Sequence, residues 1–326
     1  MKELGKRRKG TLKRLEQELE TDPAWQEEFD PKQEPEKPKQ PVKFTIELEK
    51  RELEQPGGQI MSLAASGGYL AAGLGTLLRF KRNGKNYIDD SYPFGAWDDK
   101  SGEITGIDFS NIHPAGGYLA LGSRDGRLQV YRVTYSDNRL ERKMENVFEA
   151  KAPKTINTIK FMDFSQHLAF TYDNVMQFFN FELMSKAAKF EFTKIIGGIA
   201  FHTDGVAVAY AENIRFCKAP SADSGGLEQV LHKRINEDDK YNFWINSMEF
   251  SPDFKHLAVV GGVAQNPGFI RLYHVDYDEH RLVREISLVG QAETQEPKHV
   301  AFIGNDKLVT TCGDYSLQYW NIGKNE

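Results

Sequence analysis

Leu317-Gln318-Tyr319-Trp320 is the last of six copies of one short pattern in this 326-residue sequence. Each copy has an aliphatic or similar apolar residue, then Arg or Gln, then another apolar residue and, in most copies, an aromatic residue. The other copies are Leu78–Lys81, Leu128–Tyr131, Met176–Phe179, Ile214–Cys217 and Ile270–Tyr273. A pattern that recurs every few tens of residues is typical of repeat architectures. The chain is therefore expected to consist of six related units.

Two more strand-like segments precede this pattern in each unit. The first has the form Ile-x-x-apolar-x-Phe, with looser versions in the first and last units. The second is a run of small and apolar residues, whose leading aliphatic residues are Leu70, Leu119, Leu168, Val206, Leu257 and Leu308. These positions are 49, 49, 38, 51 and 51 residues apart. A fourth and more polar segment follows the pattern in most units.

Four strands in each of six units is the arrangement typical of a β-propeller. The second strand is small and apolar because it would be crowded near the axis, and the fourth is polar because it would form the exposed edge. The sequence thus predicts an all-β, six-bladed β-propeller, with seven blades as the alternative count.

The sixth unit has only three strands before the chain ends at Glu326. A separate strand is predicted near the other end, where Val42, Phe44, Ile46 and Leu48 alternate with polar residues and share one face. We expect this strand to pair with 317–322 and to complete the last blade, which leaves no free sheet edge at either end.

Residues 1–41 differ in composition from the propeller domain, which is expected at 42–322. Residues 1–14 carry a local charge of +6, and residues 15–41 carry −6. Thr11–Glu20 is predicted to form a short helix because three leucines share one face. The four prolines of Asp30–Pro41 indicate an extended linker. This segment is either a disordered, solvated tail or an arm that binds a partner.

The overall composition excludes some classes of function. The net charge of −5 gives no general attraction to nucleic acid. Two cysteines, Cys217 and Cys312, favour a reducing compartment and are expected to be small core residues. No signal peptide and no membrane span is expected, because the chain has no long apolar run. The predicted location is cytoplasmic, with the nucleus as the alternative.

Three stretches resemble the WD40 repeat family: 250–262, 123–131 and 312–321. Asp125 and Asp314 match the family's aspartate in the turn between the second and third strands, and Trp320-Asn321 stands where Trp-Asp is usual. The resemblance covers residues 60–322 and implies a divergent WD40-like propeller that serves as a protein-interaction scaffold. Because no Gly-His dipeptide occurs, the family's His–Asp–Ser/Thr–Trp hydrogen-bond tetrad cannot be complete.

The sequence offers no catalytic residue, metal site or cofactor site. The eight histidines are scattered, and no pair has the spacing of zinc ligands. Phosphate-binding, calcium-binding and serine-hydrolase motifs are absent. The chain is therefore not expected to be an enzyme. A propeller hydrolase or lactonase with its site at the axial pore is the alternative, although the units start with Ile rather than with charged residues.

The loops that enter each blade are predicted to lie on one rim. They combine eight acidic residues and five lysines with Trp97, Tyr241 and Trp244, and aromatic residues that are exposed within charged surroundings are typical anchors of interfaces. The candidate protein-binding residues are Trp97, Asp98, Arg124, Asp125, Asp238, Tyr241, Trp244 and Tyr315. The expected ligand is a basic or mixed-charge peptide. The alternative is that both tryptophans of the rim only cap the blade cores.

The predicted function is accordingly a non-catalytic scaffold that binds partner proteins through the rim, the N-terminal arm or both. Lys6-Arg7-Arg8-Lys9 leaves a third possibility, an RNA-associated factor. A solvated basic tail or a nuclear-import signal explains the same four residues. No other nucleic-acid contact and no membrane partner is expected.

Overall fold

The computed structural model divides the chain into two compact units, residues 1–42 and residues 43–326. All residues that the structure describes belong to the second unit. They are 43–53, 60–66, 69–74, 77–82, 92–93, 102–110, 117–136, 139–162, 167–180, 185–202, 205–218, 229–234, 243–263, 266–276, 281–289, 296–313 and 316–325. The predicted helix at Thr11–Glu20 and the linker lie outside this part of the chain.

The described strands form six antiparallel sheets of four strands each, which we call blades 1 to 6. Blade 1 contains β2 (Ile60–Ser66), β3 (Tyr69–Leu74), β4 (Leu77–Arg82) and β5 (Tyr92–Pro93). Blade 2 contains β6 (Ile104–Phe109), β7 (Gly117–Ser123), β8 (Arg127–Ser136) and β9 (Arg139–Lys151). Blade 3 contains β10 (Thr158–Phe161), β11 (His167–Tyr172), β12 (Val175–Asn180) and β13 (Ser185–Glu191).

The remaining blades follow the same order along the chain. Blade 4 contains β14 (Ile196–His202), β15 (Gly205–Tyr210), β16 (Asn213–Lys218) and β17 (Gln229–Arg234). Blade 5 contains β18 (Phe243–Phe250), β19 (His256–Val263), β20 (Asn266–Asp276) and β21 (Arg281–Val289). Blade 6 contains β22 (Pro297–Phe302), β23 (Lys307–Cys312), β24 (Ser316–Asn325) and, from the other end of the chain, β1 (Lys43–Leu53).

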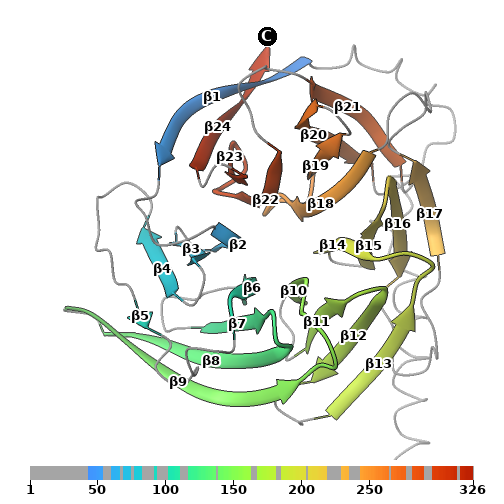
Figure 1. The fold of residues 1–326 in the computed structure, drawn as a ribbon. Helices are drawn as coiled ribbons and strands as arrows, with labels where there is room; N and C mark the ends of the chain where they lie inside the picture. Colours follow the sequence, from blue (N-terminus) through green and yellow to red (C-terminus); the bar gives the residue numbers. More distant parts are fainter. Residues whose placement is uncertain are drawn as a thin grey trace, which may run out of the picture. The chain divides into compact units, whose positions relative to one another are not determined.

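The first strand of each blade lies closest to the axis of this unit (Figure 1). Contacts join β2 to β6, β6 to β10, β10 to β14, β14 to β18, β18 to β22, and β22 back to β2. The all-β propeller class is thereby confirmed. In the described ranges, no helix is long and apolar enough to cross a membrane.

Strands from both ends of the unit pair in blade 6. β1 runs antiparallel to β24, from the pair Lys43↔Asn325 to the pair Leu53↔Ser316, with one irregularity between Leu48 and Lys50. Phe44, Ile46 and Leu48 take part in this backbone pairing, whereas their side chains, like the whole of Val42, lie outside the described part. A strand from the N-terminal side of this unit thus occupies the edge of the sheet that β22–β24 would otherwise leave open.

The hydrophobic core lies between the blades. Each of six buried clusters combines residues of two neighbouring blades, including blades 6 and 1, where Ala301, Val309 and Leu317 pack with Leu63 and Leu70. The Ile that starts each repeat belongs to these junctions: Ile104, Ile156, Ile196 and Ile245 are at most 3% exposed. Each blade is therefore stabilised mainly by its two neighbours.

The Arg or Gln of the repeated pattern contacts side chains of its own blade. The guanidinium of Arg215 lies 5.2 Å from the ring centre of Tyr210, and that of Arg271 lies 5.2 Å from the ring centre of Phe269. In blade 2 the equivalent Gln129 donates a hydrogen bond to Glu149. Gln129 and Arg271 are buried and Arg215 is half-buried. The partners differ, because rings flank the two arginines, whereas Gln129 accepts a hydrogen bond from the Tyr131 hydroxyl at 2.9 Å.

Neighbouring isoleucines test the importance of the junctions. Ile196 is 1% exposed within the cluster between blades 3 and 4, whereas Ile195 is 65% exposed. We expect Ile196→Ala to lower the free energy of unfolding by about 2–5 kcal/mol, because it leaves a cavity. Ile195→Ala should change it by less than about 0.5 kcal/mol. Urea denaturation measures both values, and equal effects would contradict the assignment of the core.

Candidate functional site

Backbone hydrogen bonds between blades fix where each first strand starts. The amide of Ile156 donates to the carbonyl of Ser123, and the amide of Ile196 donates to that of Asp173. The amide of Ile245 repeats this contact with Ala211. Each acceptor lies at the turn between the second and third strands of the preceding blade. The strand starts and these turns therefore share one end of the blades.

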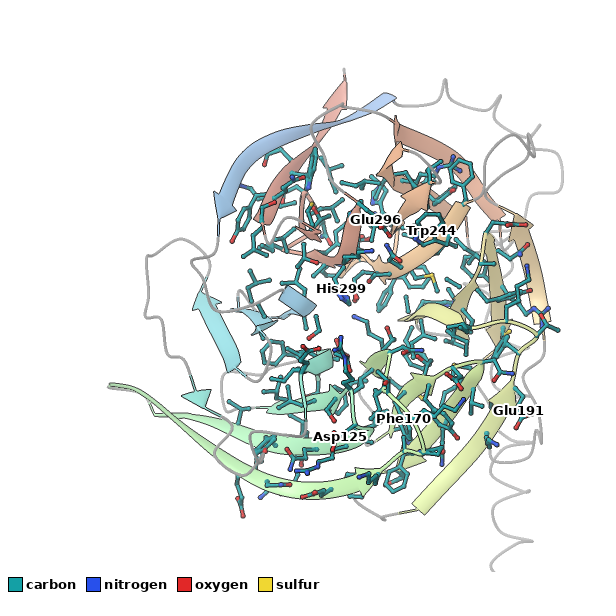
Figure 2. All side chains as sticks on the ribbon, in the orientation of Figure 1. Asp125, Phe170, Glu191, Trp244, Glu296 and His299 are labelled. Carbon is teal, nitrogen blue, oxygen red and sulfur yellow. The ribbon has the colours of Figure 1, made fainter. Side chains whose placement is uncertain are left out.

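At this end the structure forms a pocket of about 760 Å³, which we call the axial pocket. It is lined by Thr105, Arg124, Thr155, Asn157, Lys194, Ile195, Ile196, Gly197, Ala211, Trp244, Ile245, Asn246, Lys298 and His299. These residues come from blades 2 to 6. Figure 2 shows His299 near the centre of the ring of blades, so the pocket lies near the axis of this unit.

β-Bulges aim the lining residues into the pocket. In β6, β14, β18 and β22 the pairing with the next strand skips one residue near the start. The skipped residues are Thr105, Gly197, Asn246 and Lys298. All of them line the pocket. Bulges commonly redirect side chains beside functional sites, and three of these four residues, Thr105, Asn246 and Lys298, bring polar groups to the pocket.

Glu296 organises the wall of the pocket between blades 5 and 6. Its carboxylate accepts hydrogen bonds from the Trp244 indole at 2.7 Å and from the Asn246 amide at 2.6 Å. It also pairs with Lys298 at 2.7 Å. Burial works against ionisation, but these three donors outweigh it and hold the pKa of Glu296 below its ordinary value. The carboxylate is therefore charged and fully engaged near neutral pH.

This cluster lies where the repeated backbone contact cannot form. Pro297 occupies the position of the junction isoleucines, and proline has no amide hydrogen to donate. Instead, the side chain of Asn246 donates to the carbonyl of Pro297 at 2.9 Å and to Glu296. Side chains thus replace a backbone contact between blades 5 and 6.

Trp244 is held in one orientation at the edge of the pocket (Figure 2). Its ring lies against Gly262, where an added Cβ would come within 2.2 Å of the indole. Its nitrogen is bonded to Glu296, yet 37% of the residue remains exposed. Trp244 is therefore both packed on its blade and accessible from solvent. The sequence left open whether it caps the blade core or anchors a ligand, and its position allows both.

Arg124 and Asp125 are neighbours with different surroundings. Arg124 lines the pocket and forms a surface ion pair with Glu103 at 2.7 Å. Asp125 accepts a short hydrogen bond from Ser123 and pairs with Arg127 at 3.0 Å. Both carboxylate oxygens of Asp125 are thus used within its own turn. The other candidates, Trp97, Asp98, Asp238, Tyr241 and Tyr315, lie outside the described residues.

One half of the WD40 hydrogen-bond tetrad is present in blade 6. The indole of Trp320 is 3% exposed and donates to the hydroxyl of Thr310 at 3.0 Å. This contact joins β23 and β24 and accounts for the Trp at the end of the repeated pattern.

A charged bridge joins the first strands of blades 2, 3 and 5. Lys160 of β10 contacts Glu249 of β18 and lies 3.3 Å from Asp108 of β6. Blades 3 and 5 share no junction, so Lys160 and Glu249 meet on the axial side of blade 4. Asp108 follows the pocket residue Thr105 by three positions, which is about 10 Å along a strand. The bridge therefore lies further along the first strands than the pocket.

The bridge residues occupy one equivalent position, directly before the Phe near the end of their first strands. Blade 4 and blade 6 have Ala200 and Ala301 there, which leave room for the long lysine side chain. The sequence interpretation considered charges only at the blade starts and therefore missed this set. The signal was available in the repeat alignment, because three of these positions carry ionisable residues.

The geometry of the bridge favours a structural role. Burial raises the pKa of Asp108, although Lys160 and the amide of Phe161 oppose the shift. Burial alone would lower the pKa of Lys160, but the two carboxylates outweigh it and raise that pKa, which keeps the lysine charged. Asp108 uses one oxygen for Lys160 and the other for the Phe161 amide at 2.7 Å. Within the described part, no three His, Cys, Asp or Glu residues could hold a metal ion together.

Comparison with known proteins identifies the fold. No protein-family model matches the chain, and no curated protein matches it. Among solved structures, the Cps50 (Swd1) β-propeller domain of Myceliophteria thermophila is 13% identical with a TM-score of 0.55, and the match covers 81% of this chain and 84% of that one. A chain of the mitotic checkpoint complex is 13% identical with a TM-score of 0.56, over 84% of this chain and 94% of that one.

The chain has a WD40-like β-propeller fold. The resemblance seen in the repeats is thereby confirmed as to fold.

Removal of the bridging lysine should destabilise the protein. The side chains of Lys160, Asp108 and Glu249 are only 12%, 12% and 26% exposed. Lys160→Met leaves two carboxylates without their cation, and we expect a loss of about 3 kcal/mol. The triple variant Asp108→Asn, Lys160→Met, Glu249→Gln should recover part of that loss. Chemical denaturation measures both, and a triple variant less stable than the single one would contradict the bridge.

Glu296 should make the stability of the protein depend on pH. Because its pKa is lower in the folded state, its contribution is present above the ordinary value of 4.5 and is lost as the pH falls through the folded value. We expect Glu296→Gln to cost about 1 kcal/mol at neutral pH, since the site is partly exposed. The difference from wild type should shrink below pH 4.5. A difference that is constant with pH would contradict the proposed contacts.

Proposed function

We propose that this protein is a non-catalytic scaffold that binds partner proteins at the axial pocket and the loops around it. The observation that supports this most is the position of the exposed apolar side chains. In the described part of the chain, Ile195 and Trp244 are the two exposed large hydrophobic residues, and both line the axial pocket. Exposed apolar groups that gather at one concave site indicate an interaction surface.

The chemistry of the described residues supports binding more than catalysis. The carboxylates near the axis are engaged by Lys160, and those beside the pocket are paired with Arg124 and Lys298. A general base or a metal ligand needs an available lone pair in reach of a substrate. The hydrolase alternative therefore has no observation in its favour.

The similar structures agree with a scaffold role. One of them is a chain of the mitotic checkpoint complex, which is an assembly of proteins, and the other is the propeller domain of Swd1. The fold supplies a rigid frame with many loops, but it does not name a partner. The N-terminal residues 1–41 would add a second contact, and the Lys6–Lys9 cluster would act within it. A cytoplasmic or nuclear location is part of the same proposal.

Affinity purification with crosslinking tests the proposal. Full-length protein, a pocket variant and a control variant would be compared as bait. Ile195→Asp places a charge in the pocket, whereas Lys255→Glu alters an exposed turn at the other end of β18. We expect Ile195→Asp to lose specific partners that both wild type and Lys255→Glu retain. Partner sets that are identical for all three proteins would contradict binding at the axial pocket.

A further inference from the structure

The wall of the axial pocket at blades 4 and 5 has a composition that suggests what it binds. Lys194 and Ile195 precede β14, and Trp244 lies at the start of β18. All three line the pocket. The following inference rests on the proposed function, since it names the chemical class of the ligand for the same site.

The charges that line the pocket are cationic in the described part of the chain. Arg124, Lys194 and Lys298 are lining residues, and no acidic residue is. Arg124 and Lys298 already pair with Glu103 and Glu296. Lys194, by contrast, joins no acidic residue among those that the structure describes. Lys194 therefore offers an ammonium group that a carboxylate of a partner can pair with.

An apolar site lies directly beside this ammonium group. Ile195, the next residue, is 65% exposed, and Trp244 of the adjacent blade is 37% exposed. The indole is already fixed by Gly262 and Glu296. A rigid aromatic group loses little conformational entropy when a ligand packs on it, which favours binding. An apolar side chain of a partner can therefore be buried between Ile195 and Trp244.

Short polar side chains beside the wall suit a peptide ligand. Thr105, Thr155 and Asn157 all line the pocket. An extended peptide segment fits this lining, because its side chains can reach Lys194, Ile195 and Trp244 while its backbone meets the polar groups.

We propose that the axial pocket binds an extended peptide segment of a partner protein through one adjacent pair of residues. In this pair an Asp or Glu meets Lys194, and a large apolar side chain packs against Ile195 and Trp244. The described lining is cationic and therefore favours an acidic anchor, whereas the rim sequence predicts a basic or mixed-charge ligand.

Selection of peptides tests this directly. A random peptide display library would be selected against the full-length protein, and the recovered peptides would be measured by fluorescence anisotropy. We expect enrichment of Asp or Glu next to a large apolar residue. Replacement of the acidic residue by its amide, or of the apolar residue by Ser, should weaken binding about tenfold.

A charge-swap experiment then assigns the contact to Lys194. Lys194→Glu should weaken the selected acidic peptide about tenfold, and a peptide with Lys in place of the acidic residue should regain affinity for this variant. Lys255→Glu, the matched control, should bind like wild type. Peptides without acidic residues, or a Lys194→Glu variant with unchanged affinity and no recovery after the swap, would overturn the proposal.

The remaining outcomes also distinguish the two proposals. If Ile195→Asp abolishes partner capture while Lys194→Glu has no effect, the pocket binds proteins but the carboxylate contact is wrong. If the protein self-associates in sedimentation experiments and Ile195→Asp abolishes this, the occupant is a second copy of the chain, which overturns the peptide proposal.

Discussion

The packing of each blade against its two neighbours is the constraint on which the rest of the structure depends. A single four-stranded sheet has two faces to cover, and the six buried clusters show that each face is covered by the next blade. Every blade has a neighbour on both faces only if the last blade also packs against the first. The cluster between blades 6 and 1, and the pairing of β1 with β24, satisfy this requirement.

The same packing produces the pocket. First strands that start with a buried isoleucine are fixed to the preceding turn by a backbone hydrogen bond, as Ile196 is to Asp173. The bulge that follows turns a polar residue toward the axis. Pro297 cannot donate the equivalent backbone hydrogen bond. Beside it, the carboxylate of Glu296 binds Trp244 and Lys298, and these three residues form one wall of the pocket. The features that stabilise the junctions therefore also arrange the side chains that a partner would meet.

The repeated patterns allowed the fold class to be predicted because burial between blades demands the same residue types at regular intervals. The Ile and Phe positions were recognisable for this reason. The Lys160 bridge was missed because its members are far apart in sequence, with Glu249 lying 89 residues after Lys160. Only the arrangement of blades around an axis brings them together. The support of Trp244 by Glu296 could not be predicted either, since it depends on the loop conformation before Pro297.

Thermal unfolding of two truncated proteins tests the central claim, that a strand from the N-terminal side completes the last blade. Deletion of residues 1–41 keeps all of β1, whereas deletion of residues 1–50 removes most of its pairs with β24. We expect the first protein to melt at the temperature of the full chain and the second to melt several degrees lower, because it exposes an edge of β24. Equal melting temperatures for the two truncated proteins would contradict it.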